Sequence, residues 1–283
     1  MHPHTQGFPA SSLQADANKT IHPSRTELLS SRPTSLQLRP VKTLLLPFLA
    51  LIGLAVSAVG ATTDSPAELT AEDLVGAWQI EGEPKHVLTV TANYWSIATF
   101  SPGKFERTRG GTYVINPDST ARSTIQFDSA EPQEVGQDLH LQLRLENDTL
   151  HITPPGESTQ IWTRLDRAEN PLAGVWRING RNVNGTFQEM PLRARRTLKI
   201  LSGTRFQWVA INIETGEFSG TGGGTFTFEN GRYVEKIDFF SRDNSRVGAE
   251  LSFGGEVSGD TWRHHGLSSR GDPIDERWIR FQP

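Results

Sequence analysis

Short runs of aromatic and β-branched residues alternate with turn signals through the second half of the chain. The runs lie at 197–201, 205–213, 225–228, 232–240, 247–253, 257–264 and 274–281. Turn signals include Ser202-Gly203, Thr215-Gly216, Asn230-Gly231, Asp243-Asn244 and Ser258-Gly259. No long helical period interrupts them. With a further strand around Trp176, the pattern predicts about eight sequential antiparallel strands.

The first half carries the same signals in the same order. Leu74–Trp78 (LVGAW) returns as Leu172–Trp176 (LAGVW), and GGTY at 110–113 returns as GGTF at 223–226. Asp148-Thr149 returns as Asp260-Thr261, and the closing 160–164 (QIWTR) returns as 276–280 (ERWIR). Order is kept with only short insertions. The simplest explanation is a tandem repeat of one fold, over residues 72–166 and 172–283.

Eight sequential antiparallel strands in a domain of this length most naturally close into an up-and-down barrel. We therefore predict an all-β protein of two tandem up-and-down antiparallel β-barrels. A two-sheet sandwich is the alternative that the strand pattern leaves open.

The amino-terminal region differs from the rest in composition. Residues 1–40 are polar and lack apolar periodicity, whereas residues 41–61 combine Lys42, a short apolar run and small residues at Val59 and Ala61. The latter pattern predicts a signal peptide and export to the periplasm or the extracellular space. Because Val41 can be the internal reading of an alternative start codon, residues 1–40 are either a mis-annotated extension or a disordered tail. The alternative for 41–61 is an uncleaved anchor.

Charge and cysteine content narrow the class of protein. Removing residues 1–61, which hold five basic and two acidic residues, takes the formal charge from −4 to −7. That balance argues against nucleic acid as a partner, and we expect no stable membrane insertion after signal cleavage. The chain has no cysteine, which excludes disulfides and a lipidated junction.

These motifs resemble the lipocalin-like, or calycin, group. The Gly-x-Trp opening strand and a late strand with Trp and Arg carry the resemblance, and the second copy is similar to uncharacterised secreted bacterial lipocalin-like domains. The resemblance implies small-molecule binding inside a barrel. It also implies structural pairs of a first-strand Trp with a last-strand Arg, here Trp78 with Arg164 and Trp176 with Arg280.

Alternation along residues 232–240 predicts which side chains face inward. Tyr233, Glu235, Ile237 and Phe239 share the more apolar face, so Glu235 is predicted to be a carboxylate on the core side. Aligning the two copies puts Ser123 of the first where Glu235 stands in the second.

The same comparison places a histidine inside the second copy. Trp262 and His264 share a face, and their counterparts Leu150 and Ile152 are both apolar. Because burying an ionisable group without a partner is costly, Glu235 and His264 are predicted to be paired or used. The alternative is that they only hydrogen-bond one another, or that they meet water at the barrel mouth.

A predicted ligand site in the second barrel joins these groups to nearby aromatic rings. Its residues are Phe206, Trp208, Phe226, Tyr233, Glu235, Trp262 and His264. Trp208 aligns with Trp95 in this comparison, which favours a structural role for it, and such aromatic residues are more often core than ligand platform.

Three further patterns carry less weight. His264-His265 face opposite ways in a strand, so we predict no metal site, and no cofactor motif is present. The glycines of 220–224 (GTGGG) lack the Lys and helix of a phosphate-binding loop and predict a hairpin turn or bulge. Arg193, Arg195 and Arg196 form a basic cluster within an insertion, either a solvated edge or a lid that meets an anionic ligand.

The leading functional hypothesis is noncatalytic capture of a small apolar or amphipathic molecule in the second barrel. A second hypothesis is a secreted isomerase, lyase or hydrolase that uses Glu235 and His264 as acid and base; no catalytic residue is assigned. A third is an envelope interaction module without a pocket. The sequence does not define protein partners.

Overall fold

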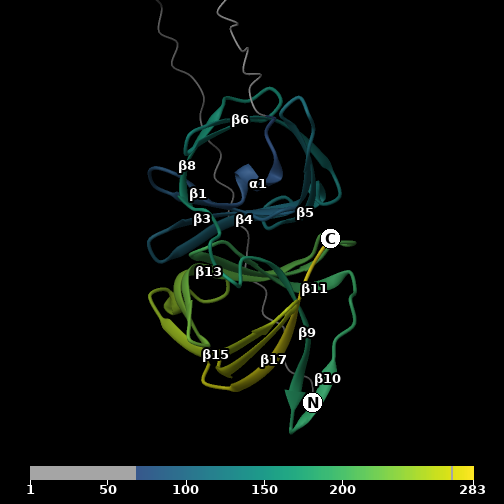
Figure 1. Ribbon diagram of the computed structural model, residues 1–283, viewed down its shortest axis with the longest axis vertical. Helices are drawn as coiled ribbons and strands as arrows, with labels where there is room; N and C mark the ends of the chain where they lie inside the picture. Colours follow the sequence, from purple (N-terminus) through teal and green to yellow (C-terminus); the bar gives the residue numbers. More distant parts are fainter. Residues whose placement is uncertain (1–67, 269) are drawn as a thin grey trace, which may run out of the picture. The chain divides into compact units, whose positions relative to one another are not determined.

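Each half of the repeat forms a closed β-barrel in the computed structural model, which describes residues 68–268 and 270–283 (Figure 1). In the first, a short helix precedes eight antiparallel strands paired in sequence order, and the last pairs with the first. The elements are α1 (Ala71–Leu74), β1 (Gly76–Ile80), β2 (Lys85–Val90), β3 (Tyr94–Ser101), β4 (Lys104–Ile115), β5 (Thr120–Asp128), a 3-10 turn (Pro132–Glu134), β6 (Asp138–Glu146), β7 (Thr149–Thr153) and β8 (Gln160–Asp166).

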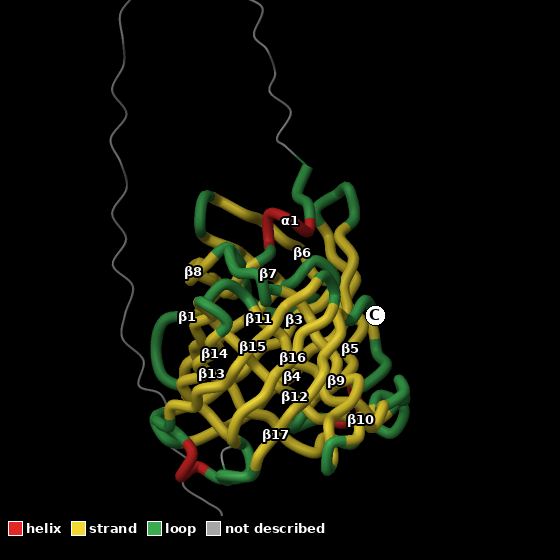
Figure 2. The backbone as a smooth tube through the Cα atoms, turned by 60° about the horizontal axis from the view of Figure 1, so that its bottom comes forward, coloured by secondary structure: helices red, strands yellow, loops and turns green. Residues whose placement is uncertain are grey.

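The second barrel repeats this order and adds one hairpin. Its opening strand is longer and turns back into a short extra strand, after which the barrel closes by pairing of the last strand with the first. The elements are β9 (Gly174–Val183), β10 (Thr186–Glu189), β11 (Arg195–Leu201), β12 (Arg205–Asn212), β13 (Phe218–Glu229), β14 (Arg232–Phe240), a 3-10 turn (Asn244–Arg246), β15 (Glu250–Ser258), β16 (Thr261–Leu267) and β17 (Pro273–Arg280). Figure 2 shows how strands dominate the described chain.

Both barrels confirm the predicted fold class and the internal repeat, and their closure excludes the sandwich. Three predicted runs have clearly different bounds in the structure, the first being 225–228, which lies within the longer β13. The predicted runs 247–253 and 257–264 are displaced because β15 continues to Ser258 and the chain turns at Gly259, which has a positive φ of 54°. The β10 strand was not predicted, because its four residues are exposed and carry no apolar alternation.

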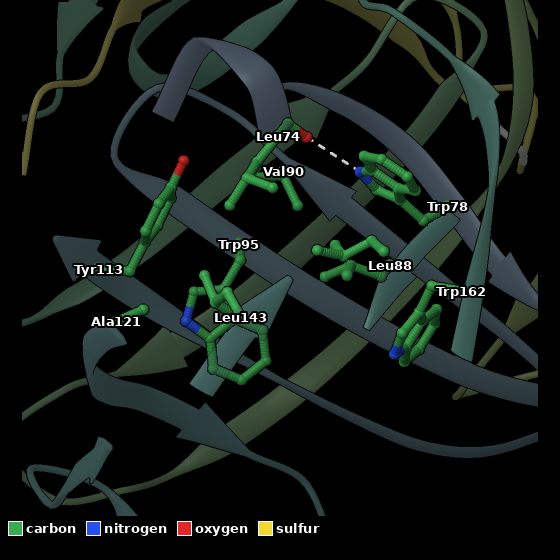
Figure 3. Close-up of a cluster of buried hydrophobic side chains, with 10 residues drawn as sticks. Leu74, Trp78, Leu88, Val90, Trp95, Tyr113, Ala121, Leu143 and Trp162 are labelled. Atoms are coloured by element: carbon green, nitrogen blue, oxygen red, sulfur yellow. Dashed lines mark hydrogen bonds between the residues drawn. The ribbon is translucent and has the colours of Figure 1, made fainter. Parts of the chain in front are cut away.

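A Trp and an Arg close the same end of each barrel. In the first, Nε1 of Trp78 donates to the Leu74 carbonyl (2.9 Å), while the Arg164 guanidinium lies 3.8 Å from the Trp78 ring centre. Arg164 also donates to the carbonyls of Asp73 and Val75. Because these carbonyls belong to or follow α1, the two side chains hold the helix against the barrel. Figure 3 shows the hydrogen bond from Trp78 to Leu74.

The second barrel repeats the arrangement without the helix. Nε1 of Trp176 donates to the Leu172 carbonyl (2.7 Å), and Arg280 lies 4.4 Å from the Trp176 ring centre. Gly174 has a φ of 128°, and a Cβ there would lie 2.8 Å from an Nη atom of Arg280. Glycine therefore permits both the backbone conformation and the close approach of the guanidinium.

A bulge corrects the predicted face of β14. Tyr233, Glu235 and Ile237 are buried, as their alternation predicts. Between Gly223 and Gly224 the register with β13 shifts by one residue, so the alternation reverses beyond Ile237. Phe239 therefore packs against Phe100 of the first barrel (ring centres 4.9 Å apart), whereas Phe240 joins the core of the second. The glycine run is thus a strand with a bulge, one of the two predicted alternatives.

The two barrels belong to one compact unit and share apolar clusters. Tyr94 and Phe127 of the first barrel pack with residues of β9, β11 and β12, and Nε2 of Gln207 donates to Oγ1 of Thr108 (2.7 Å). At the link, the Asp166 carboxylate accepts hydrogen bonds from Ser202, Gly203 and Thr204.

The predicted extension 1–40 and signal peptide 41–61 lie outside the described residues. Within the described residues, no helix has the length and apolarity needed to cross a membrane.

Candidate functional site

The first barrel contains a partly open cavity of about 160 Å³. Its wall is mainly aliphatic, with Leu74, Leu88, Val90, Ile97, Ala121, Leu139, Leu141, Leu143, Leu150 and Ile152. Figure 3 shows Leu74, Leu88, Val90, Ala121 and Leu143 around this core. An apolar cavity of about 150 Å³ is large enough to accept a benzene ring. The size and the wall therefore suit a small apolar molecule or one apolar segment of a larger one.

Polar groups lie at defined points of this cavity. Ser123 is buried, and its Oγ accepts a hydrogen bond of 2.6 Å from Nε1 of Trp95. Arg109 lines the wall, with Nε 3.4 Å from a carboxylate oxygen of the fully buried Asp128. Glu157 and Gln160 line the wall from the segment where β7 ends and β8 begins. An amphipathic ligand would find polar partners there and aliphatic contacts elsewhere.

The interior of the second barrel holds a buried ion pair. Nζ of Lys199 donates to Oε1 of Glu235 at 2.7 Å, and both residues are 5% exposed. The ammonium also lies 4.8 Å from the ring centre of Tyr233 and 5.0 Å from that of Trp262. Trp278 and Phe253 complete the surrounding rings. Lys199 thus occupies an aromatic cage that would suit a ligand cation.

His264 belongs to a second polar group in the same interior. Its Nδ1 lies 3.4 Å from the Glu276 carboxylate, which also accepts a hydrogen bond from Nε1 of Trp278 (3.1 Å). Burial and then the charge of Lys199 lower the pKa of His264, so the imidazole is neutral at pH 7. Burial, and then the charge of Glu235, raise the pKa of Tyr233 well above its usual value. The polar partner of Glu235 is thus Lys199, whereas that of His264 is Glu276.

Strand pairings give the residue correspondence between the barrels. Trp78 pairs with Leu88 and Trp176 with Lys199, so Lys199 stands where the first barrel has Leu88. Continuing around each barrel matches Ala121 with Tyr233, Leu141 with Phe253, Leu150 with Trp262 and Ile152 with His264. At each of these positions the second barrel carries the bulkier or the more polar side chain.

The same pairings match Ser123 with Glu235, as the sequence comparison had it, but correct the alignment of Trp208. Trp208 corresponds to Ile97, and Phe206 corresponds to Trp95, because β3 and β12 pair with their neighbours in the same register. Opposite Trp208 stands Gly222, where a Cβ would lie 2.7 Å from Nε1 of the indole. Gly222 is the counterpart of Arg109, so the Trp208 ring lies over a glycine where the first barrel has an arginine.

The structure brings the predicted site residues of the second barrel into one packed cluster. Phe206, Phe226, Tyr233 and Trp262 are buried in a common core, with Trp208 packed against it. Glu235 and His264 lie within the same interior. Ligand binding by this cluster stays a prediction, and so does the acid and base role of its two titratable residues.

Sequence reasoning missed two components of the interiors. The first was Lys199, which lies between the apolar Leu198 and Ile200, so that alternation would have placed it on the outer face. Those two neighbours instead pack against the first barrel, and Lys199 points inward. The second was the aliphatic cavity of the first barrel, which no polar residue marks in the sequence. The described residues hold no group of three or more His, Cys, Asp or Glu side chains that could bind a metal ion.

Comparisons with known proteins do not identify a family for this chain. No family model matches the chain, and no curated protein sequence matches it. Among solved structures, a lipocalin-like protein from Bacteroides uniformis is similar over 39% of this chain and 98% of its own, with 13% identity and a TM-score of 0.29. The Helicobacter pylori β clamp bound to a DNA ligase peptide is similar over 74% and 58%, with 10% identity and a TM-score of 0.14. The description of the fold rests on the strand pairings.

Proposed function

We propose that this is an exported protein that captures a small apolar or amphipathic molecule in the cavity of its first barrel, without catalysis. The supporting observation is the aliphatic cavity of about 160 Å³. Burying apolar surface there contributes about 25 cal/mol per Å² of that surface. The sequence analysis placed the ligand in the second barrel. We prefer the first because its small side chains leave room where the second has rings and charges.

The proposed ligand has one apolar portion about as large as an aromatic ring and one polar end. The apolar portion would contact Leu141, Leu143 and Ile152, and the polar end would lie near Arg109 or Gln160. An aliphatic pocket with a few convergent polar groups is the usual form of a small-molecule site. Export rests on the sequence pattern of residues 41–61 and would be tested by finding the mature chain in the periplasm or medium.

The test is recovery of bound molecules from the full chain expressed in its own host. Solvent extraction and mass spectrometry of the purified protein are expected to reveal a defined small molecule. Ala121→Phe should abolish its recovery, because the added ring enters the cavity at the position where the second barrel has Tyr233. Thermal melting would verify that the variant is folded.

Ala130→Phe is the matched control, since Ala130 is exposed and does not line the cavity. This variant should retain the molecule at the wild-type level. Equal recovery of the molecule from wild type and from folded Ala121→Phe would contradict the proposal. A wild-type protein that yields no bound molecule and does not bind added benzene would also contradict it.

A further inference from the structure

A second cavity, of about 290 Å³, is lined by residues of the second barrel and is strongly basic. Five arginines line it: Arg177, Arg193, Arg195, Arg196 and Arg242. Its remaining wall is Ile178, Met190, Pro191, Thr197, Ala210 and Ser219. Among the described residues, no acidic side chain lines this cavity. The whole chain has a net charge of −4, so this concentration of positive charge is local.

Backbone carbonyls hold three of the five arginines. One Nη atom of Arg177 donates to the carbonyls of Ile178 (3.0 Å) and Met190 (2.8 Å). Nε of Arg196 donates to the Arg193 carbonyl (3.0 Å), and Nε of Arg242 donates to the Ser219 carbonyl (2.8 Å). Within the described chain, none of the five forms an ion pair with a carboxylate. The guanidinium groups of Arg177, Arg196 and Arg242 are therefore positioned, while the charges of all five are left uncompensated by direct contact with a carboxylate.

Local structure makes space for these side chains. Arg177 is only 8% exposed, which is unusual for a cation without a paired carboxylate. Gly220 has a φ of 145°, and a Cβ at that position would collide with Nε of Arg242. The Arg242 guanidinium also lies 5.5 Å from the Trp208 ring centre. The chain thus has a specific conformation that lets Arg242 reach the cavity wall.

The guanidinium groups repel one another in the unliganded arrangement. Burial, followed by the positive charge of Arg196, lowers the pKa of Arg177. Burial also lowers the pKa of Arg196. Both groups nevertheless stay charged at neutral pH, because a guanidinium does not deprotonate in proteins. An anion placed between them would remove this repulsion and satisfy free N–H donors.

Most of this basic character is specific to the second copy. Strand correspondence matches Arg177 with Gln79, Arg195 with Pro84, Arg196 with Lys85 and Arg242 with Ala130. Arg193 lies in the segment between β10 and β11, which follows the hairpin that only the second barrel has. Three of the four matched positions, Gln79, Pro84 and Ala130, thus carry no charge in the first copy.

We propose that the arginine cavity is a binding site for a phosphate group, presented by a soluble phosphate compound or by a lipid headgroup. Arginine suits this ligand because its planar fork of donors matches phosphate oxygens, and each charge-assisted hydrogen bond is stronger than a neutral one. A basic, partly enclosed wall also concentrates anions near it. The site is separate from the apolar cavity of the first barrel and stands whether or not that cavity binds a ligand.

The test measures pyrophosphate binding to the full chain by titration calorimetry at low ionic strength. We expect one site, with affinity that falls as sodium chloride is added. Arg193→Gln with Arg195→Gln should weaken binding about tenfold or more, since both groups face the cavity and neither is used in a hydrogen bond that holds the fold. Arg144→Gln with Arg232→Gln removes the same charge elsewhere and should change affinity less than about twofold.

Vesicle sedimentation distinguishes the two sources of phosphate. Binding of pyrophosphate in solution supports a soluble ligand. Binding only to phosphatidylcholine vesicles that contain phosphatidic acid, lost in the Arg193 and Arg195 double variant, supports a lipid headgroup. The proposal is overturned if neither probe binds, or if both double variants weaken binding equally.

Discussion

The two barrels share a fold and a closing Trp–Arg pair but fill their interiors in opposite ways. Where the first has Leu88, Ala121, Leu150 and Ile152, the second has Lys199, Tyr233, Trp262 and His264. The first set leaves an aliphatic cavity, whereas the second supplies a cation and the rings that surround it. Two copies of a repeat can thus keep the same strand framework while their inward side chains differ, so that one interior is open and the other is packed.

Breaking the ion pair of the second barrel is expected to give the largest effect. Lys199→Leu, which introduces the residue of the first barrel, leaves Glu235 buried without its cation and should cost about 3–5 kcal/mol of unfolding free energy. Adding Glu235→Ser should recover much of that loss, because no unpaired charge remains. Urea unfolding measures both. Equal stability of the single and double variants would show that the pair does not couple these positions.

Removing the closing tryptophan should cost a similar or slightly smaller amount. Trp176 is fully buried, contacts Arg280 and packs edge to face on Trp262 (ring centres 5.7 Å apart). Trp176→Ala is expected to lose about 3–5 kcal/mol. Trp78→Ala tests the first barrel in the same way. A loss below about 1 kcal/mol in urea unfolding would mean that the pair is dispensable for closure.

The pH dependence of stability should differ between the interiors because of His264. Burial lowers its pKa, so the unfolded chain takes up a proton that the folded chain resists. This contribution to stability is present above the unfolded pKa of about 6.5 and is lost as pH falls toward the lower folded value. His264→Ile, the residue of the first barrel, should flatten stability between pH 7 and pH 5. Thermal melts across this range would detect the change, and an unchanged slope would contradict it.

The smallest expected loss of stability follows a substitution of Asp166, at the link between the barrels. Burial alone would raise the pKa of Asp166, but hydrogen bonds from Thr204, Gly203, Ala168 and Ser202 outweigh burial and lower it. The resulting stability is present above the unfolded pKa of about 3.9 and is lost as pH falls below it. Asp166→Asn should cost about 1 kcal/mol at pH 7 and less at pH 3. A cost that is the same at both pH values in urea unfolding would exclude a role for the carboxylate charge.

Much of the architecture could be predicted from the sequence, since short motifs such as GGTY and GGTF keep their order in both copies. Alternation also predicted the inward positions of Tyr233 and Glu235. It failed at Phe239, because a bulge adds one residue and reverses the faces without any change in hydrophobic pattern. Local periodicity does not report such a shift in pairing.

The choice of barrel could not be predicted for a different reason. Sequence reasoning followed the unusual polar residues, Glu235 and His264, to the second barrel. Whether an interior is open depends on the summed volumes of side chains from eight strands, including Lys199, which lies 36 residues from its partner. The arginine cluster at 193–196 was visible in the sequence, but Arg177 and Arg242 join it only through the fold.

Methyl NMR of the full chain titrated with benzene tests whether the first barrel is the one that accepts an apolar ligand. We expect saturable shifts at the methyl groups of Leu141, Leu143 and Ile152, which line the cavity. The methyl groups of Leu201, Ile237 and Leu251 in the second barrel should stay unchanged. Shifts confined to the second set, or none in either set, would contradict the proposed function.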